Sequence, residues 1–458
     1  ILQGNEVNKM NYQEFKNAVV KYATANEIKD YELYYTKSDE TSVEIFQTEV
    51  KGFNSSNSLG ICFRCIVNGQ TGYASTENMT EAEAESIVLR AIENALALES
   101  ESPSFIHQKG DTYLTYEKEE ITSPSASTLI DFALNLQKEI YAQDERVVDG
   151  TQALAGFGSS EKAIFNSNGL DLVDSACFDY SYAVAIVSDG NEMYDGAEIQ
   201  SGKIAEFDKT ELAKEAVKDA LSSIGYTSVD SGTYTVVFSN KVMASLLSVY
   251  SSIFSAEAAQ KGLSLLKDKE GDVIASDIVT LTDDPLYKDA LVKSTFDDEG
   301  AATHAKNIIE NGKFTTLLHN LATAAKAGVK TTGNGYKASY SSPVGINHYS
   351  FYINPVKGTL EDLFAEVGNG IYITSVEGLH AGADAISGDF SLSSGGFRIE
   401  NGKKTTPVKG ITISGNFLQL MKDITAIGED LKFSPWALSA HRCGSPSVLV
   451  KEINIAGK

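Results

Sequence analysis

"EKAIFNSNGLDLVDSACFDYSYAVAIVSDG", residues 161–190, decides the fold class of the first half of the chain. Its apolar, β-branched and aromatic residues form two long runs, typical of strands, around a polar turn "FNSNGLDL" at 165–172. Helical periodicity precedes these runs at 126–144 and follows them at 208–225. Because the connection between the runs is short, we expect an antiparallel sheet within an α+β unit.

The first hundred residues repeat this order of patterns. Residues 12–25 have helical periodicity, and so do residues 79–99, where Thr80 offers an N-cap and Glu83 a capping-box partner. Between them lie strand-like runs at 31–37, 42–50, 58–67 and 72–76. The segment "FNSSNSLG" at 53–60 resembles the turn at 165–172 and is predicted to be its equivalent. These similarities indicate a weak internal duplication of the α+β unit, with chance similarity as the alternative.

The composition changes near residue 230, after "GYTSVDSGTY", and we predict a domain boundary there. The expected domains are an N-terminal α+β domain, residues 1–228, with antiparallel sheets, and a β-rich C-terminal domain, residues 229–458. The second half carries Asn-Gly hairpin signals at 309–316 and 399–406. Its helices are expected near 241–267, 319–327, 359–366 and 416–427.

The charge balance excludes one broad class of partner. The 458 residues include 38 basic and 62 acidic side chains, a formal charge of −24, and no window gathers the cations that phosphate neutralisation needs. Direct DNA or RNA binding is therefore disfavoured. No stretch has the roughly 20 apolar residues of a membrane helix, so we expect no membrane contact.

Four cysteines are few for a secreted chain of this length, and we expect reduced thiols in the cytoplasm. Cys62 and Cys65 form a C-x-x-C within a predicted strand, where residues three apart face opposite sides, so a shared metal or disulfide is not expected. The chain starts at Ile1 without an initiator Met. We expect natural translation to begin at Met10 or further upstream, which leaves open whether residues 1–9 are native.

Familiar catalytic motifs are missing from the chain. There is no P-loop, no dinucleotide fingerprint, no G-x-S-x-G and no H-E-x-x-H. Structural or surface roles are expected for each of the six histidines, although a spatially assembled triad or metal site stays open. The histidines are His107, His304, His319, His348, His380 and His441.

Phrases rich in Gly, Asp and Asn stand out in the second half. They are "TFDDEGA", "TTGNGYK" and "AISGDFSLSSGGFRIENGK", the last of which contains Gly395 and Gly396. Turn chemistry explains them best from physics alone, because Gly supplies positive φ and Asp or Asn bonds its own backbone. A groove that an extended peptide approaches closely is the alternative.

The chain resembles the TldD/PmbA family, also called modulator-of-gyrase proteins. The resemblance rests on seven ordered segments from both halves: "VNGQTGYAST", "TFDDEGA", "IIENGKFTTLLHN", "TTGNGY", "ISGDFSLSSGGFRIENGK", "PVKGITISGN" and "GSPSVLVKEINIAG". It implies a two-domain fold in a cytoplasmic metallopeptidase system for peptides or unfolded chains. The family works as a pair, in which a TldD-type subunit holds zinc through H-E-x-x-x-H on a helix and a PmbA/TldE-type subunit lacks that motif.

The resemblance places the metal helix on "MASLLSVYSSIF". Its first histidine, glutamate and second histidine would fall on Ser248, Val249 and Ile253, none of which can do the corresponding work. Cys443 does not stand in the family's C-G-K context, and we do not expect it to be a ligand. The chain is therefore identified as a PmbA/TldE-type subunit with no catalytic or metal residues of its own.

The segment "SLLSVYSSIFSAEAAQKG" at 245–262 has an apolar stripe and a second stripe of serines: Ser245, Ser248, Ser252 and Ser255. Histidines five apart need a helical distortion to share one ion. Without a metal, we predict a regular helix from Val242 to Ala259. Its serine face should pack against a neighbour or line a vestigial cavity.

The leading expectation is a non-catalytic subunit that dimerises through its β-rich half with a TldD-type chain or a second copy. Zinc is expected in a TldD-type partner, none in this chain. The candidate groove residues for an extended substrate are Asp297, Asp298, Glu299, Gly300, Gly333, Asn334, Gly335, Ser387, Gly388 and Asp389. Two alternatives stay open: a stand-alone peptidase with a serine nucleophile or a metal on His348 and His380, and a regulatory protein acting on a topoisomerase or toxin system.

Overall fold

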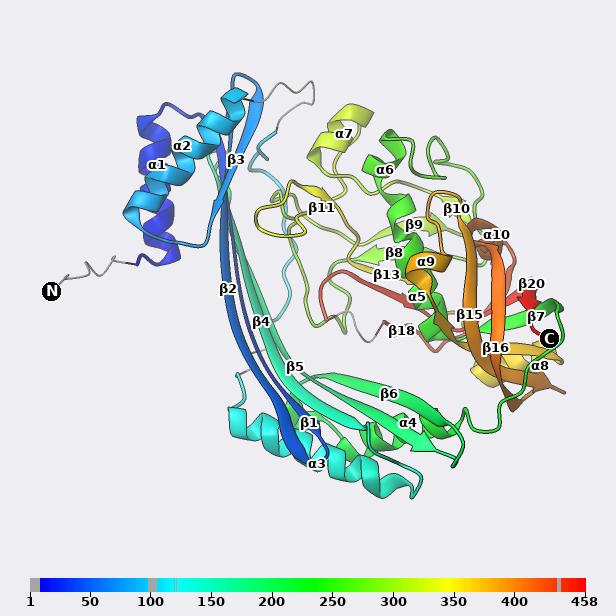
Figure 1. The fold of residues 1–458 in the computed structure, drawn as a ribbon. Helices are drawn as coiled ribbons and strands as arrows, with labels where there is room; N and C mark the ends of the chain where they lie inside the picture. The colour runs from blue at the N-terminus through cyan, green and yellow to red at the C-terminus, as the bar shows by residue number, and fades with distance from the viewer. Residues whose placement is uncertain (1–8, 98–104, 119, 121, 435–437) are drawn as a thin grey trace.

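A long, curved, six-stranded sheet organises the N-terminal half (Figure 1). The computed structural model describes residues 9–97, 105–118, 120, 122–434 and 438–458. The sheet has the order β3-β2-β1-β4-β5-β6, and every neighbouring pair is antiparallel. Its strands are β1 (Asp30–Phe46), β2 (Glu49–Val67), β3 (Gln70–Thr76), β4 (Gln152–Asn166), β5 (Asp171–Ser188) and β6 (Met193–Gly202).

Helices cover the two ends of this sheet. Figure 1 shows α1 and α2 at one end and α3 and α4 at the other, and each pair packs on its own apolar core. Their first turns are fixed by polar caps, for example the capping box of Asn11 and Glu14 at the start of α1. The helices are α1 (Tyr12–Ala25), α2 (Glu81–Ala97), α3 (Ala126–Gln143) and α4 (Lys209–Leu221), with a 3₁₀ turn η1 (Ile204–Glu206).

The order helix, three strands, helix occurs twice along the chain. The first unit runs from α1 to α2 and the second from α3 to α4, and they meet at the antiparallel β1–β4 pair. The element order thus agrees with the duplication suggested by sequence. The predicted turn at 53–60 is wrong, because these residues continue β2 and pair with β1. The real β1–β2 turn is Gln47–Thr48, at positive φ, and the two runs predicted at 31–37 and 42–50 form the single strand β1.

Two packed sheets and a large shared core make the second half β-rich, which confirms the predicted α+β class. One sheet has the order β16-β15-β14-β7-β20-β17 with an extra β16–β20 pairing, the other β10-β9-β8-β13-β19-β18, and β11–β12 form a small ribbon. Their strands are β7 (Gly232–Phe238), β8 (Leu281–Asp284), β9 (Lys306–Glu310), β10 (Lys313–Phe314), β11 (Gly335–Tyr336), β12 (Gly345–Ile346), β13 (Ser350–Ile353), β14 (Gly370–Glu377), β15 (Asp389–Glu400), β16 (Lys403–Asn416), β17 (Ile424–Ile427), β18 (Lys432–Phe433), β19 (Arg442–Ser445) and β20 (Val448–Ala456).

Short helices connect these strands. They are α5 (Asn240–Tyr250), η2 (Ser251–Phe254), α6 (Ala256–Gln260), α7 (Leu321–Ala327), α8 (Leu360–Val367), α9 (Leu379–Gly382) and α10 (Phe417–Lys422). The predicted helix at 416–427 is too long, because residues 424–427 leave it to pair with β20. The sequence analysis did not predict α9.

Both predicted Asn-Gly hairpins are confirmed. Asn311 and Gly312 have φ of 48° and 80° and join β9 to β10, while Asn401 and Gly402, at 52° and 72°, join β15 to β16. Positive φ at both central residues is the turn geometry that matches the twist of a hairpin.

Cys62 and Cys65 face opposite sides of β2, as their spacing predicted. Cys62 packs with Tyr34 and Phe296, whereas Cys65 belongs to the core beneath α1 and α2. All four cysteines are free thiols. Among the described helices, none combines the length and apolar character needed to cross a membrane. Residues 1–8, part of the uncertain start of the chain, lie outside the described residues.

Candidate functional site

The serine-rich segment is broken into three short elements, so the predicted regular helix from Val242 to Ala259 is wrong. The helix α5 ends at Tyr250, the 3₁₀ turn η2 follows, and Ser255 caps the new helix α6 through a bond from the Ala258 N–H. The break has a distant cause. Leu318 donates its N–H to the carbonyl of Phe254 and accepts the N–H of Ala256, which holds this backbone in an extended bridge.

The three positions matched to the metal helix lie in different surroundings. Ser248 is exposed, Val249 is partly buried against the core, and Ile253 is only 1% exposed within it. Because the side chain of Ile253 packs into the apolar core while Ser248 is exposed, this backbone does not direct positions 248 and 253 toward one shared metal ion.

A thiol and an imidazole stand beside Ser248. The Cys443 Sγ lies 3.5 Å from His348 Nε2 and is hydrogen-bonded by the Ser248 side chain. The Nδ1 of His348 lies 2.8 Å from the carbonyl of Tyr349, so Nδ1 carries the proton and Nε2 accepts one. Burial raises the pKa of the Cys443 thiol and lowers the pKa of His348. The two groups therefore form a neutral S–H···N pair.

This arrangement does not fit a catalytic zinc ion. Such a site needs three protein ligands and an open position, and within the described residues no three His, Cys, Asp or Glu side chains gather in metal-binding geometry. Sequence spacing led us to reject Cys443 as the counterpart of the family's cysteine, yet the structure places it against Ser248, the position matched to the first histidine.

A small cleft of about 290 Å³ lies beside this pair, and Ser251, Ser252, Ser255, Leu318 and His348 are among its lining residues. Two of the four serines of the predicted stripe, Ser252 and Ser255, thus line a cavity, whereas Ser245 and Ser248 do not.

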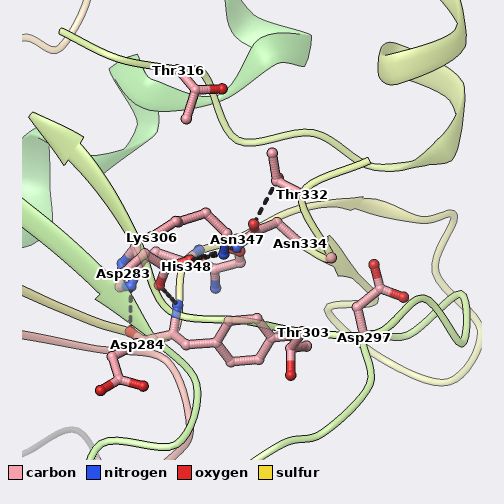
Figure 2. A network of polar contacts seen from close by, with 12 residues as sticks. Asp283, Asp284, Asp297, Thr303, Lys306, Thr316, Thr332, Asn334, Asn347 and His348 are labelled. Carbon is pink, nitrogen blue, oxygen red and sulfur yellow. Dashed lines mark hydrogen bonds and ion pairs between the residues drawn. The ribbon is translucent and has the colours of Figure 1, made fainter. Parts of the chain in front are cut away.

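A buried polar network centred on Asp283 lies next to His348 (Figure 2). The Asp283 carboxylate accepts from Lys306 Nζ at 2.9 Å, Asn334 Nδ2 at 2.9 Å and the Tyr349 N–H at 2.6 Å. Burial is the largest single effect and favours the neutral acid, but the Lys306 ammonium and the hydrogen bonds from Asn334 and the Tyr349 N–H together outweigh it, so the pKa of Asp283 is lowered. Asn334, a predicted groove residue, is fully buried here and also donates to the carbonyl of Asn347.

The acidic phrase at 297–300 joins the two halves of the chain. Asp298 pairs with Lys162 of β4 at 3.0 Å, and the Glu299 carboxylate lies 3.7 Å from Arg64 of β2. Asp297 is fully buried and accepts three backbone N–H groups, from residues 299, 301 and 335. Burial and the Glu299 charge raise the pKa of Asp297 to about 7.

The structure brings the first two glycine-rich phrases together. The Asp298 N–H donates to the Gly335 carbonyl and the Gly335 N–H to Asp297. Gly300 and Gly333 have φ of 82° and 69°, and a Cβ at Gly333 would lie 2.5 Å from the carbonyl oxygen of residue 302. At these positions the turn explanation holds.

The third phrase has other partners. Asn416 bonds the Ser387 carbonyl and the Asp389 carboxylate, the N–H of Phe417 bonds the Gly388 carbonyl, and Tyr250 donates to the Asp389 carbonyl. Each of these bonds ties residues 387–389 to α5 or α10.

The two histidines of the stand-alone metal hypothesis also differ in setting. His348 is buried beside Cys443, whereas His380 lies exposed on α9.

Sequence models of one family cover most of the chain. The PmbA/TldA metallopeptidase domain 1 matches residues 31–95, the central domain 119–224 and the C-terminal domain 231–457. A crystal structure of a proposed modulator of a DNA gyrase from Thermotoga maritima is 31% identical, covers 97% of this chain and 100% of its own, and superimposes with a TM-score of 0.89. The chain belongs to the PmbA/TldD metallopeptidase family.

Other members of the PmbA/TldD family agree in length and fold. The metalloprotease PmbA homolog of Haemophilus influenzae is 25% identical over 93% of this chain and 92% of its own. TldE from Thermococcus kodakarensis, at 21% identity, shares the fold with a TM-score of 0.87 over 96% of this chain and 99% of its own. The boundary expected between residues 228 and 229 stays a prediction.

A larger cleft lies between the two halves of this PmbA/TldD chain, and sequence reasoning missed it. It holds about 460 Å³ and is lined by β1, β2, β4 and β5 on one side and by loops of the second half on the other. Among the predicted groove residues, Asp298 and Gly335 line it. No local signal marks such a cleft, because its walls come from segments more than 100 residues apart.

Proposed function

We propose that this chain is a non-catalytic, PmbA/TldE-type subunit of a cytoplasmic metallopeptidase system that acts on peptides or unfolded proteins. One observation carries the proposal: the positions matched to the family's zinc helix hold Ser248, Val249 and Ile253. A serine hydroxyl is a poor zinc ligand at neutral pH, and neither aliphatic side chain can bind a metal or act as a base.

Among the described residues, the neighbourhood of Ser248 holds no set of three metal ligands. Cys443 and His348 supply two donor atoms, one of them a thiol whose pKa is raised by burial. A zinc-bound water also needs a general base close by, and the position matched to that base is Val249.

The proposal includes a partner. A TldD-type chain would supply the zinc and the catalytic glutamate, and the β-rich half of this chain would form the contact, with a second copy of the chain as the other possible partner. Support comes from the names of the relatives, which include metalloprotease PmbA, metalloprotease TldD and TldE proteins.

Zinc content tests the proposal. The purified chain is dialysed against a weak chelator and analysed for metal, with a TldD-type relative treated in parallel as the control that keeps its zinc. We expect near zero zinc in this chain and about one ion per chain in the control. One tightly held zinc per chain in this protein would contradict the proposal.

A further inference from the structure

The floor of the cleft between the halves contains a row of small side chains across the N-terminal sheet. Strand register places Ser58, Ser38, Ser160 and Ala176 in one row across four strands, and Ser56, Glu40, Gly158 and Phe178 in the next. Facing side chains normally fill the space between packed layers. Here the short side chains leave a trough across the sheet, beneath the loops of the second half.

The trough is open at its β2 side. The strand β3 pairs only with residues 61–67 of β2. Residues 49–60 of β2 therefore have no strand paired along their outer edge among the described parts of the chain. Ser56 of this free stretch lines the cleft. Four strands span three spacings, roughly 14 Å, which is the length of about four extended residues. A bound peptide longer than this can extend past the outer edge of β2.

The cations of the cleft are already engaged, which disfavours an anionic ligand. Lys162 Nζ donates to Ser294 Oγ, to the carbonyl of Phe296 and to Asp298. Lys337 Nζ lies over the rings of Tyr34 and Tyr73, at 5.1 and 5.5 Å from their centroids. Lys293, the third lysine that lines the cleft, donates its Nζ to the carbonyl of Lys288 at 3.0 Å.

The histidine that lines the cleft, His441, is uncharged near neutral pH. Burial lowers the pKa of His441 to about 4. Its imidazole therefore adds no positive charge for an anion to bind.

Carboxylate acceptors line the cleft. Asp174 is 6% exposed, and its Oδ1 accepts from Tyr116, Lys118 and the Ser175 N–H, whereas its Oδ2 is buried with no hydrogen-bond partner within the described chain. Glu40 accepts the hydroxyl of Tyr180. A ligand here should bring N–H donors and no negative charge, and rings of Tyr34, Phe178, Tyr180, Tyr336 and Tyr349 border its path.

We propose that this trough is the binding site for the substrate chain: an extended, uncharged or basic polypeptide segment of about four residues crosses β5, β4, β1 and β2 between the two halves. An extended backbone supplies alternating N–H donors to the carboxylates and serine hydroxyls, and the aromatic walls accept its side chains. This inference rests on the proposed function, because it takes a peptide as the ligand.

Photo-crosslinking tests the site on the full chain. The probe is a ten-residue peptide of uncharged residues with a central benzoylphenylalanine, and adducts are located by mass spectrometry after digestion. We expect adducts in the digestion products that contain residues 152–188. Adducts confined to other parts of the chain would overturn the inference, as would stronger competition by a neutral oligosaccharide than by unlabelled peptide.

Matched glycine variants show whether the trough itself holds the peptide. A Cβ at Gly158 meets only the Phe178 ring at 3.5 Å, an ordinary contact, so Gly158→Tyr should fold and fill the trough. Gly52→Tyr, on β2 outside the cleft and equally open, is the control. We expect about 10-fold less crosslinking for Gly158→Tyr and less than about 2-fold change for Gly52→Tyr.

A second filling variant and a separate readout keep the result clear. Ser160→Tyr should act as Gly158→Tyr does, so unchanged crosslinking in both folded variants would refute the site. Zinc content is measured on the same samples. A chain free of zinc that binds the peptide elsewhere would remove this inference and leave the proposed function standing, whereas a zinc-loaded chain would remove the proposed function.

Discussion

At the residue scale, the side chain at position 248 decides whether a metal can bind beside Cys443. We expect Ser248→His to create a three-ligand zinc site, because the new imidazole would join the Cys443 thiol and the Nε2 of His348. Zinc displaces the thiol proton, so uptake should increase with pH. The measurement is one zinc per chain by elemental analysis, or the visible spectrum of bound cobalt.

The control for that variant is Ser245→His, one turn earlier on α5, where the hydroxyl bonds the Lys241 carbonyl. It should take up no metal. If Ser248→His binds no more zinc than the natural chain, the position assigned to Cys443 next to Ser248 is wrong.

A second residue-scale prediction concerns the network under His348. Lys306→Met leaves the Asp283 carboxylate buried without its cation, which should lower the free energy of unfolding by about 3–5 kcal/mol. Lys261→Met, which removes an exposed pair with Glu257, should cost less than about 1 kcal/mol. Urea unfolding of both variants gives the comparison, and equal losses would contradict it.

The same pair predicts the direction of a pH effect. Lys306 lowers the folded-state pKa of Asp283 below its unfolded value of about 3.9. The resulting stability is fully present above about pH 4 and is lost as the pH falls through the folded pKa. In the Lys306→Met variant, the free energy of unfolding should no longer contain this loss at low pH. Unfolding curves measured from pH 6 down to pH 2 would show the difference.

At the element scale, the Asn-Gly hairpin between β9 and β10 gives a sharp stability test. Gly312 has φ of 80°, and a Cβ there would lie 2.6 Å from the carbonyl oxygen of Ala275. Gly328, the C-cap of α7, has φ of 70° with open space around it. Both alanine variants incur about 1–2 kcal/mol for the left-handed backbone, and Gly312→Ala adds a clash. We expect its loss in urea unfolding to be at least about twice that of Gly328→Ala.

Local signals predicted most elements, and distant contacts explain the failures. The Asn-Gly turns and the capped helices α1 and α3 depend on neighbouring residues, so the sequence was sufficient for them. The break after Tyr250 depends on Leu318, more than 60 residues away. Residues 53–60 have the composition of a turn, yet pairing with β1 makes them strand, because an exposed edge tolerates Asn and Ser.

At the scale of the whole molecule, the first of the predicted groove phrases joins the two halves of the chain. Asp298 and Glu299 meet Lys162 and Arg64 from the N-terminal sheet, more than 130 residues earlier in the chain. No spacing rule indicates such partners. The motifs were sufficient to identify the family, whereas the cleft above the small-sided floor required the assembled structure.

We propose that this chain contributes binding but no catalysis to a two-chain peptidase. Cleavage of an unfolded peptide is measured with the purified chain alone and after addition of a zinc-loaded TldD-type relative. We expect no cleavage above the blank for the chain alone and cleavage in the mixture that exceeds that of the relative by itself. Cleavage by the chain alone, abolished by a chelator, would contradict it.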